Sequence, residues 1–126
     1  MSKILVVDDD VTMTSLMMAL MKMEGHEPTT VNESPRAIEI ASTLKPDLIT
    51  LDLMMPDLTG FELCDLLHRD PRFVNIPILI VSARDDTESK EKAKAAGACD
   101  YLTKPFAVDQ LLEKINALTA EAKSGE

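Results

Sequence analysis

Short apolar runs alternate with longer stretches of mixed polarity from one end of the chain to the other. These runs lack the strict alternation of apolar and polar positions that marks a sheet with one solvated face. They are typical of parallel strands, which are covered on both faces. We predict five strands: Lys3–Val7, Glu27–Val31, Leu48–Leu51, Ile76–Val81 and Ala98–Leu102.

The stretches between these strands carry start and stop signals of helices. The first helix is predicted from about Val11 to Glu24, because Gly25 suits the left-handed position after a helix end. Ser34 and Pro35 supply an N-cap and a first-turn proline for the second helix, which ends before Pro46.

The three remaining helices have comparable signals. The segment Thr59–Glu62 has the pattern of a capping box and opens the third helix. Asp85 or Asp86 caps a fourth helix that ends at Gly97. The fifth is predicted from about Val108 to Ala120, with an apolar face made of Leu111, Leu112, Ile115 and Leu118.

Five strand–helix units in tandem predict an α/β fold with right-handed crossovers. The chain has 126 residues, which is the length of one domain. We expect that domain over residues 1–120, and a polar tail over residues 121–126 that is either a free terminus or the start of a linker. In such a fold, ligands collect beyond the carboxyl ends of the strands.

The composition excludes several classes of protein. Asp and Glu number 22 against 13 Lys and Arg, and the formal charge of −9 repels phosphate backbones, so we expect no direct nucleic-acid binding. No apolar run has the length of a membrane span, and Ile4–Val7 leads straight into three aspartates, unlike a signal peptide. Cys64 and Cys99 form no close-spaced motif. We expect a cytoplasmic protein without membrane contact.

Acidic residues stand directly behind two of the predicted strands. Asp8, Asp9 and Asp10 come after the first strand, and Asp52 comes after the third. If these strands are neighbours, their carboxylates share one small region, where like charges about 4 Å apart cost about 4 kcal/mol at an effective dielectric near 20. Such a cluster requires a counter-cation, and carboxylate oxygens with open water positions suit Mg²⁺.

Ser82 follows the fourth strand and Lys104 follows the fifth. A dication, an ammonium group and a hydroxyl around one carboxylate form a site for a phosphoryl group. We expect Asp52 to be the nucleophile, because its strand is central. For the run Asp8–Asp10 alone, helix capping in a solvated loop is an equally good explanation.

Four motifs stand at the strand ends: Ile4–Asp9 (ILVVDD), Leu51–Gly60 (LDLMMPDLTG), Ile80–Ala83 (IVSA) and Asp100–Phe106 (DYLTKPF). In this order they resemble the receiver domain of two-component response regulators, and the resemblance covers residues 3 to about 120. It implies a single-domain (βα)5 flavodoxin-like fold, with a five-stranded parallel sheet of order 2-1-3-4-5 and helices on both faces.

The resemblance also implies roles for the residues of the acidic site. Asp52 is similar to the phospho-acceptor, and Asp8 and Asp9 are similar to the acidic pair that holds Mg²⁺. Asp52 and the backbone carbonyl of Met54 complete the protein ligands, and Mn²⁺ can substitute. Ser82 is similar to the hydroxyl residue that bonds the phosphoryl oxygen.

Three further positions have counterparts in the family. Lys104 resembles the lysine that pairs with the phosphoryl group, and the bond from Lys104 to Pro105 resembles one that is cis. Tyr101 resembles the aromatic residue whose rotation accompanies activation. Asp10 lies outside the usual acidic pair, and we expect it to be an N-cap or a supporting acid.

The implied function is a signalling switch, not an enzyme with a free substrate. Mg²⁺-dependent transfer from a sensor histidine kinase or a histidine phosphotransfer domain places a phosphoryl group on Asp52. The surface around the fourth helix, fifth strand and fifth helix then selects a downstream effector or output domain. His26 and His68 are far from the acidic motifs, so another protein supplies the phosphohistidine. Both a monomer and a phosphorylation-promoted homodimer fit this scheme.

Two features of this chain refine the expectation. Met54 and Arg84 occupy positions that tune phosphoryl lifetime in the family, and a bulky apolar side chain with a long cation predicts slow self-hydrolysis. In the methionine-rich first helix, we expect Leu16, Leu20 and Met23 to face the sheet. Its solvent-side methionines would then contribute to kinase docking.

Three other functions fit parts of the sequence. Asp8, Asp10 and Thr12 match the D-x-D-x-T motif of haloacid-dehalogenase-type phosphatases, but that interpretation leaves Asp52 without a role. An FMN binder of flavodoxin type needs a hydroxyl- and glycine-rich phosphate loop, where this chain has carboxylates. An interaction scaffold without phosphorylation is the third alternative, and the complete set of site residues argues against it.

Overall fold

The structure, a computed structural model, describes residues 2–124 and contains one parallel sheet of order β2-β1-β3-β4-β5. The strands are β1 (Lys3–Val7), β2 (Glu27–Val31), β3 (Leu48–Leu51), β4 (Ile78–Ser82) and β5 (Asp100–Thr103). This confirms the predicted (βα)5 architecture and its strand order. The first three strands have the predicted bounds. The last two begin and end later than predicted, because the apolar pattern continues into the loops that precede them.

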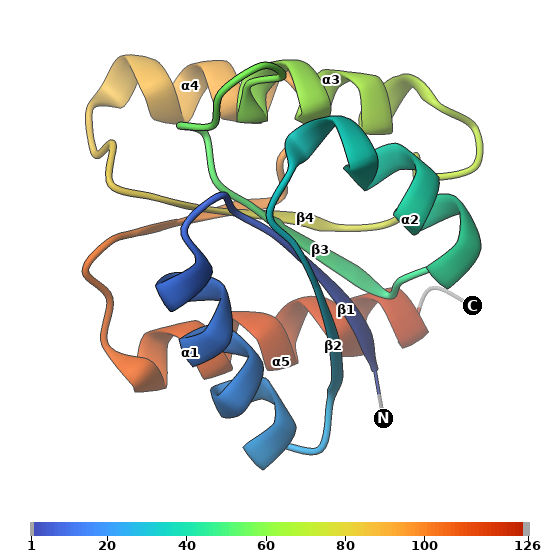
Figure 1. Cartoon of the computed structure of the whole chain (residues 1–126), viewed down its shortest axis with the longest axis vertical. Helices are drawn as coiled ribbons and strands as arrows, with labels where there is room; N and C mark the ends of the chain where they lie inside the picture. The colour runs from blue at the N-terminus through green and yellow to red at the C-terminus, as the bar shows by residue number, and fades with distance from the viewer. Residues whose placement is uncertain (1, 125–126) are drawn as a thin grey trace.

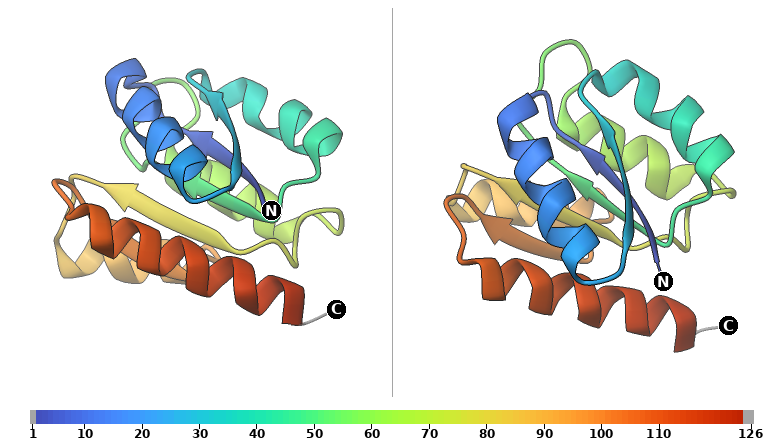
Figure 2. Two further views of the ribbon diagram at one scale, coloured as in Figure 1. Left: turned by 90° about the horizontal axis from the view of Figure 1, so that it is seen from below. Right: turned by 60° about the horizontal axis from the view of Figure 1, so that its bottom comes forward.

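Helices cover both faces of the sheet (Figures 1 and 2). One face carries α1 (Val11–Met23) and α5 (Val108–Ser124). The other carries a short 3₁₀ helix (Ser34–Arg36), α2 (Ala37–Leu44), α3 (Gly60–Arg69) and α4 (Thr87–Ala95). Helix α5 continues through Ser124 and therefore ends beyond Ala120. None of the helices within residues 2–124 combines the length and hydropathy that a membrane crossing requires.

The central strands β1, β3 and β4 contribute side chains to two separate cores, which explains why these strands are apolar at almost every position. In β1, Leu5 and Val7 belong to the core under α2, α3 and α4. Ile4 and Val6 belong to the core under α1 and α5. Because successive side chains of a strand point to opposite faces, a strand covered on both sides has no polar period.

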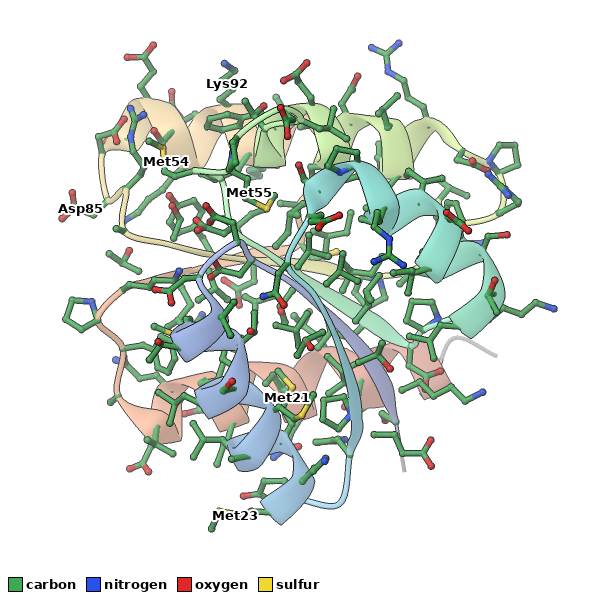
Figure 3. The ribbon with its side chains drawn as sticks, viewed as in Figure 1. Met21, Met23, Met54, Met55, Asp85 and Lys92 are labelled. Carbon is green, nitrogen blue, oxygen red and sulfur yellow. The ribbon has the colours of Figure 1, made fainter. Side chains whose placement is uncertain are left out.

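The orientation predicted for α1 is confirmed for Leu20, which packs against the core under α1 and α5, and is wrong for Leu16 and Met23. Thr14, Met17 and Met21 face the sheet, whereas Leu16 and Met23 are exposed. Figure 3 shows Met21 pointing inward between α1 and α5, and Met23 projecting from the end of α1. The helix is apolar on several faces, so the hydrophobic pattern alone did not fix the buried one.

The N-cap predicted at Ser34 is also wrong, although Pro35 does stand in the first turn. The Ser34 hydroxyl donates instead to the carbonyl of Pro56, at 3.1 Å, and so joins the 3₁₀ helix to the loop after β3. Other predicted caps are confirmed. Thr59 forms the capping box of α3 with Glu62, and Asp86 rather than Asp85 caps α4.

Candidate functional site

The loops that follow β1, β3, β4 and β5 gather at the carboxyl edge of the sheet, on the left in Figure 1. The register pairs Val7 with Leu51, so the residues that follow them, Asp8 and Asp52, leave the sheet side by side. A backbone hydrogen bond of 3.1 Å from the Asp52 N–H to the Val7 carbonyl ties the two strand ends together. The strand order therefore creates the acidic cluster.

Three carboxylates converge at this edge. Asp8, Asp9 and Asp52 each place an oxygen within 4.8 Å of the others. Asp8 and Asp52 are buried, at 2% and 6% exposure, and Asp9 is exposed. Burial, followed by the charge of Asp8, raises the pKa of Asp52 above its ordinary value. The cluster has the charge and the hard oxygen donors of a divalent-cation site.

Lys104 supplies the one cation seen in contact with these carboxylates in the described residues. Its Nζ lies 2.7 Å from Asp8 Oδ2 and 3.5 Å from Asp52 Oδ2. Burial alone would lower the pKa of Lys104, but the hydrogen bond to Asp8 and the charge of Asp52 raise it, so the side chain is an ammonium group. The peptide bond from Lys104 to Pro105 is cis, as the resemblance implied.

Ser82 ends β4 at the same edge and is fully buried. Its Oγ accepts a hydrogen bond of 3.3 Å from the backbone N–H of Arg84. The half-buried Tyr101 donates its hydroxyl to the Arg84 carbonyl at 2.5 Å, and burial raises the pKa of this phenol. The loop after β4 thus connects the acidic site to the only tyrosine of the chain.

Met54 and Arg84 lie together at the rim of the site. The Arg84 Nη1 atom is 3.9 Å from Met54 Sδ, and the Met54 N–H donates to Asp52 Oδ1 at 3.2 Å. In Figure 3, Met54 and Asp85 mark this end of the molecule. Sequence analysis did not find the ion pair of 3.2 Å between Arg84 Nε and Asp86 Oδ1, because no spacing rule predicts a contact inside an irregular loop.

Contacts around Asp8 show that Asp8 and Asp10 have different roles in the acidic run. The Asp10 N–H donates to Asp8 Oδ1 at 2.9 Å, while the Asp10 side chain caps α1 through Met13, as expected. Asn32, which no sequence motif singled out, donates to the Asp8 carbonyl at 2.9 Å. Helix capping thus explains Asp10 but not Asp8.

Gly60 is a further residue that sequence reasoning missed as part of the site. A Cβ atom on Gly60 would lie 2.1 Å from the backbone oxygen of Asp52, so only glycine permits α3 to start this close to the end of β3. Its position as the first residue after the Thr59 cap was the available signal.

The two histidines do not contribute to the site. His26 directly precedes β2 with its Nε2 3.0 Å from Asn116 Oδ1, and it is half-buried. His68 is exposed and packs near Gly97. Neither histidine is near the acidic cluster, which lies at the carboxyl edge of the sheet.

Comparison with known proteins gives a consistent result. The family model of the response regulator receiver domain matches residues 4–116. The DNA-binding dual master transcriptional regulator RpaA of Synechocystis is 38% identical over 118 residues, which cover 94% of this chain and 49% of RpaA. Protein PilH of Pseudomonas aeruginosa is 36% identical over 120 residues, which cover 95% of this chain and 99% of PilH. The chain thus spans about half of one relative and nearly all of the other.

Solved structures agree with the sequence relatives. The receiver domain of the Francisella response regulator 1452 superimposes with a TM-score of 0.89 at 34% identity, covering 96% of this chain and 98% of that one. Vibrio cholerae chemotaxis protein CheY4 also gives 0.89, at 30% identity, covering 94% and 98%. These matches leave the phosphatase and FMN-binder alternatives without support. The chain belongs to the family of response regulator receiver domains.

Proposed function

We propose that this receiver domain accepts a phosphoryl group on Asp52 from a phosphohistidine of a sensor histidine kinase or a histidine phosphotransfer domain. The observation that carries the proposal is the convergence of Asp8, Asp9 and Asp52 with Lys104 and Ser82 at one sheet edge. A carboxylate oxygen of Asp52 attacks phosphorus, the bond to the donor imidazole nitrogen breaks, and the electron pair returns to that nitrogen.

The proposed cofactor is Mg²⁺, for which Mn²⁺ can substitute. Asp8, Asp9, Asp52 and the backbone carbonyl of Met54 would hold it, and carboxylate and carbonyl oxygens are the donors that both ions prefer. When bound, the ion neutralises charge on the carboxylates and on the transferred group. The chain's own contribution is to keep the three carboxylates together, which burial and the Asp10 contact to Asp8 both support.

We assign Lys104 and Ser82 to the phosphoryl oxygens. Lys104 is a charged ammonium group at the end of β5, and Ser82 carries a buried hydroxyl at the end of β4. Together they would bind the added negative charge at the sheet edge that carries the acidic cluster. Lys104 and Ser82 would position the phosphoryl group and neutralise its charge, and they turn over no free substrate.

We propose Tyr101 as the connection from the site to the output surface of α4, β5 and α5. Its hydroxyl donates to the Arg84 carbonyl, and the Arg84 N–H donates to Ser82, so movement of Ser82 toward a phosphoryl group reaches Tyr101 through one residue. The effector or output domain, a homodimer formed on phosphorylation, the absence of direct nucleic-acid contacts and a cytoplasmic location remain predictions.

The test is intact mass after incubation with acetyl phosphate and Mg²⁺, for the native protein and for Asp52→Asn. We expect one phosphoryl group on the native chain, none without Mg²⁺ and none on the variant. Absence of the adduct, with beryllofluoride also failing to bind, would indicate an interaction scaffold and contradict the proposal. A phosphoryl group that is still added to Asp52→Asn but not to Asp8→Asn would identify Asp8 as the acceptor.

A further inference from the structure

Asp86 is fixed by α4 and at the same time holds Arg84. Its Oδ2 accepts from the backbone N–H of Ser89 at 2.9 Å, and its Oδ1 accepts from the Ser89 hydroxyl at 2.9 Å. Oδ1 also pairs with Arg84 Nε at 3.2 Å. Because Ser89 is buried, at 2% exposure, the Asp86 carboxylate is anchored to the helix and Arg84 is the partner that can move.

Arg84 lies between Asp86 and Met54 at the rim of the acidic site. Its guanidinium is bound to Asp86 on one side and touches the sulfur of Met54 on the other. Met54 is the residue whose N–H contacts Asp52 Oδ1. The Arg84 side chain is 46% exposed, so little packing opposes its rotation from one position to the other.

We propose that Asp86 is a positioning residue, which holds the Arg84 guanidinium away from the acidic site and competes for it with a phosphoryl group on Asp52. This inference rests on the proposed function. A phosphoryl dianion with three free oxygens is a better guanidinium acceptor than a carboxylate that already accepts two hydrogen bonds from Ser89. Phosphorylation draws Arg84 across the rim, while Asp86 keeps its cap on α4.

Asp86 stays negatively charged under ordinary conditions, so it always competes with the phosphoryl group for Arg84. Hydrogen bonds from the Ser89 backbone and hydroxyl, with a further one from Arg84, lower the pKa of Asp86 to about 2. Asp86 is therefore a full anion at neutral pH, with or without Arg84 beside it. The pair is solvent-exposed on both sides, so the exchange is weak and reversible.

The experiment measures the affinity for beryllofluoride, a phosphoryl mimic, in the presence of Mg²⁺ by NMR titration of backbone amides. Asp86→Asn keeps an N-cap, because Asn caps helices as well as Asp, and removes the charge that holds Arg84. We expect it to bind beryllofluoride about two- to fivefold more tightly, the range set by an exposed ion pair. Asp86→Glu restores the charge, and we expect it to return the affinity toward the native value.

Two controls separate positioning from a general charge effect. Asp85→Asn removes the adjacent exposed carboxylate, which makes no ion pair within the described part of the chain, and we expect a smaller gain from it. In an Arg84→Ala background, Asp86→Asn should give no larger gain than Asp85→Asn does. Equal gains in Asp85→Asn and Asp86→Asn, or a gain from Asp86→Asn that is as large without Arg84 as with it, would overturn the proposal.

The same titration distinguishes this inference from the proposed function. A native protein that binds beryllofluoride and an Asp86→Asn variant with no gain would overturn the role of Asp86 alone. A native protein that neither binds beryllofluoride nor takes label from acetyl phosphate would overturn the proposed function, and the inference with it.

Discussion

Asp52 carries its negative charge in surroundings that oppose it. The side chain is buried beside Asp8, and burial followed by the charge of Asp8 raises its pKa. The Asp52 carboxyl group therefore ionises more easily in the unfolded chain than in the folded protein. The stability linked to Asp52 is therefore fully present below the ordinary pKa of 3.8 and is lost as the pH rises through the folded-state value.

Asp52→Asn should therefore stabilise the protein at neutral pH when EDTA removes divalent ions. We expect the free energy of unfolding to rise by on the order of 1 kcal/mol, a typical size for a single substitution. The gain should disappear below pH 3.8, where Asp52 is protonated in both states. Urea denaturation of both proteins at the two pH values measures the difference, and a less stable variant at neutral pH would contradict this account.

The two thiols should differ sharply in reactivity. Cys64 lies on the buried face of α3, and burial raises the pKa of its thiol to about 12, whereas Cys99 is exposed. Since the thiolate is the reactive form, iodoacetamide should modify Cys99 alone in the folded protein and both cysteines in guanidinium chloride. Peptide mapping by mass spectrometry identifies the alkylated residue. Modification of Cys64 at the rate of Cys99 in the folded state would show that α3 opens readily.

At the scale of elements, helix ends were predictable where a side chain or a glycine announces them. Gly25, at φ +83°, and Thr59, with its capping box, show such signals directly. Helix α2 ends at Leu44, before Pro46 as predicted, but nothing in the sequence announced the left-handed conformation of its C-cap residue Lys45, at φ 52°. The face of α1 was mispredicted for a related reason, because Leu16 and Met17 are both apolar and only packing against the sheet selects Met17.

The left-handed residues at the ends of α1 and α2 permit a matched pair of substitutions. Lys45→Gly should raise the free energy of unfolding by about 0.5–1 kcal/mol, because glycine adopts this conformation without strain. Gly25→Ala should lower it by about 1 kcal/mol, since a Cβ there meets no atom within 4 Å and the whole effect comes from the backbone. Thermal and urea unfolding measure both. A destabilising Lys45→Gly would show that the lysine side chain contributes more than its backbone strain costs.

At the scale of the whole molecule, the sequence was most informative where function and topology coincide. Ser82 ends a strand and Asp8, Asp52 and Lys104 each follow one, so a parallel sheet of the expected order necessarily brings them to one edge. No comparable rule predicts which side chains of neighbouring loops come into contact. The pair of Arg84 with Asp86 depends on side-chain directions that only the folded backbone defines.

The ion pair between Lys104 and Asp8 connects the loop after the last strand, β5, to the loop after the first, β1. Its loss should therefore destabilise the whole molecule. Lys104→Ala leaves two buried carboxylates without their ammonium partner, at 14% exposure for Lys104 and 3% for Asp8. In EDTA we expect the free energy of unfolding to fall by about 2–3 kcal/mol. Lys114→Ala removes a pair of similar length with Asp100 that is far more exposed, and should cost less than about 1 kcal/mol.

Mg²⁺ should then recover part of the stability lost in Lys104→Ala, because a cation bound only by the folded state stabilises it by mass action. The gain from Mg²⁺ should be larger in this variant than in the native protein, since the carboxylates no longer have Lys104 as a competing partner. Asp9→Asn removes one proposed metal ligand without disturbing the contact between Lys104 and Asp8, and should weaken the Mg²⁺ effect. Melting temperatures with and without Mg²⁺ measure all three proteins. Equal Mg²⁺ gains in the native, Lys104→Ala and Asp9→Asn proteins would place the ion away from these carboxylates.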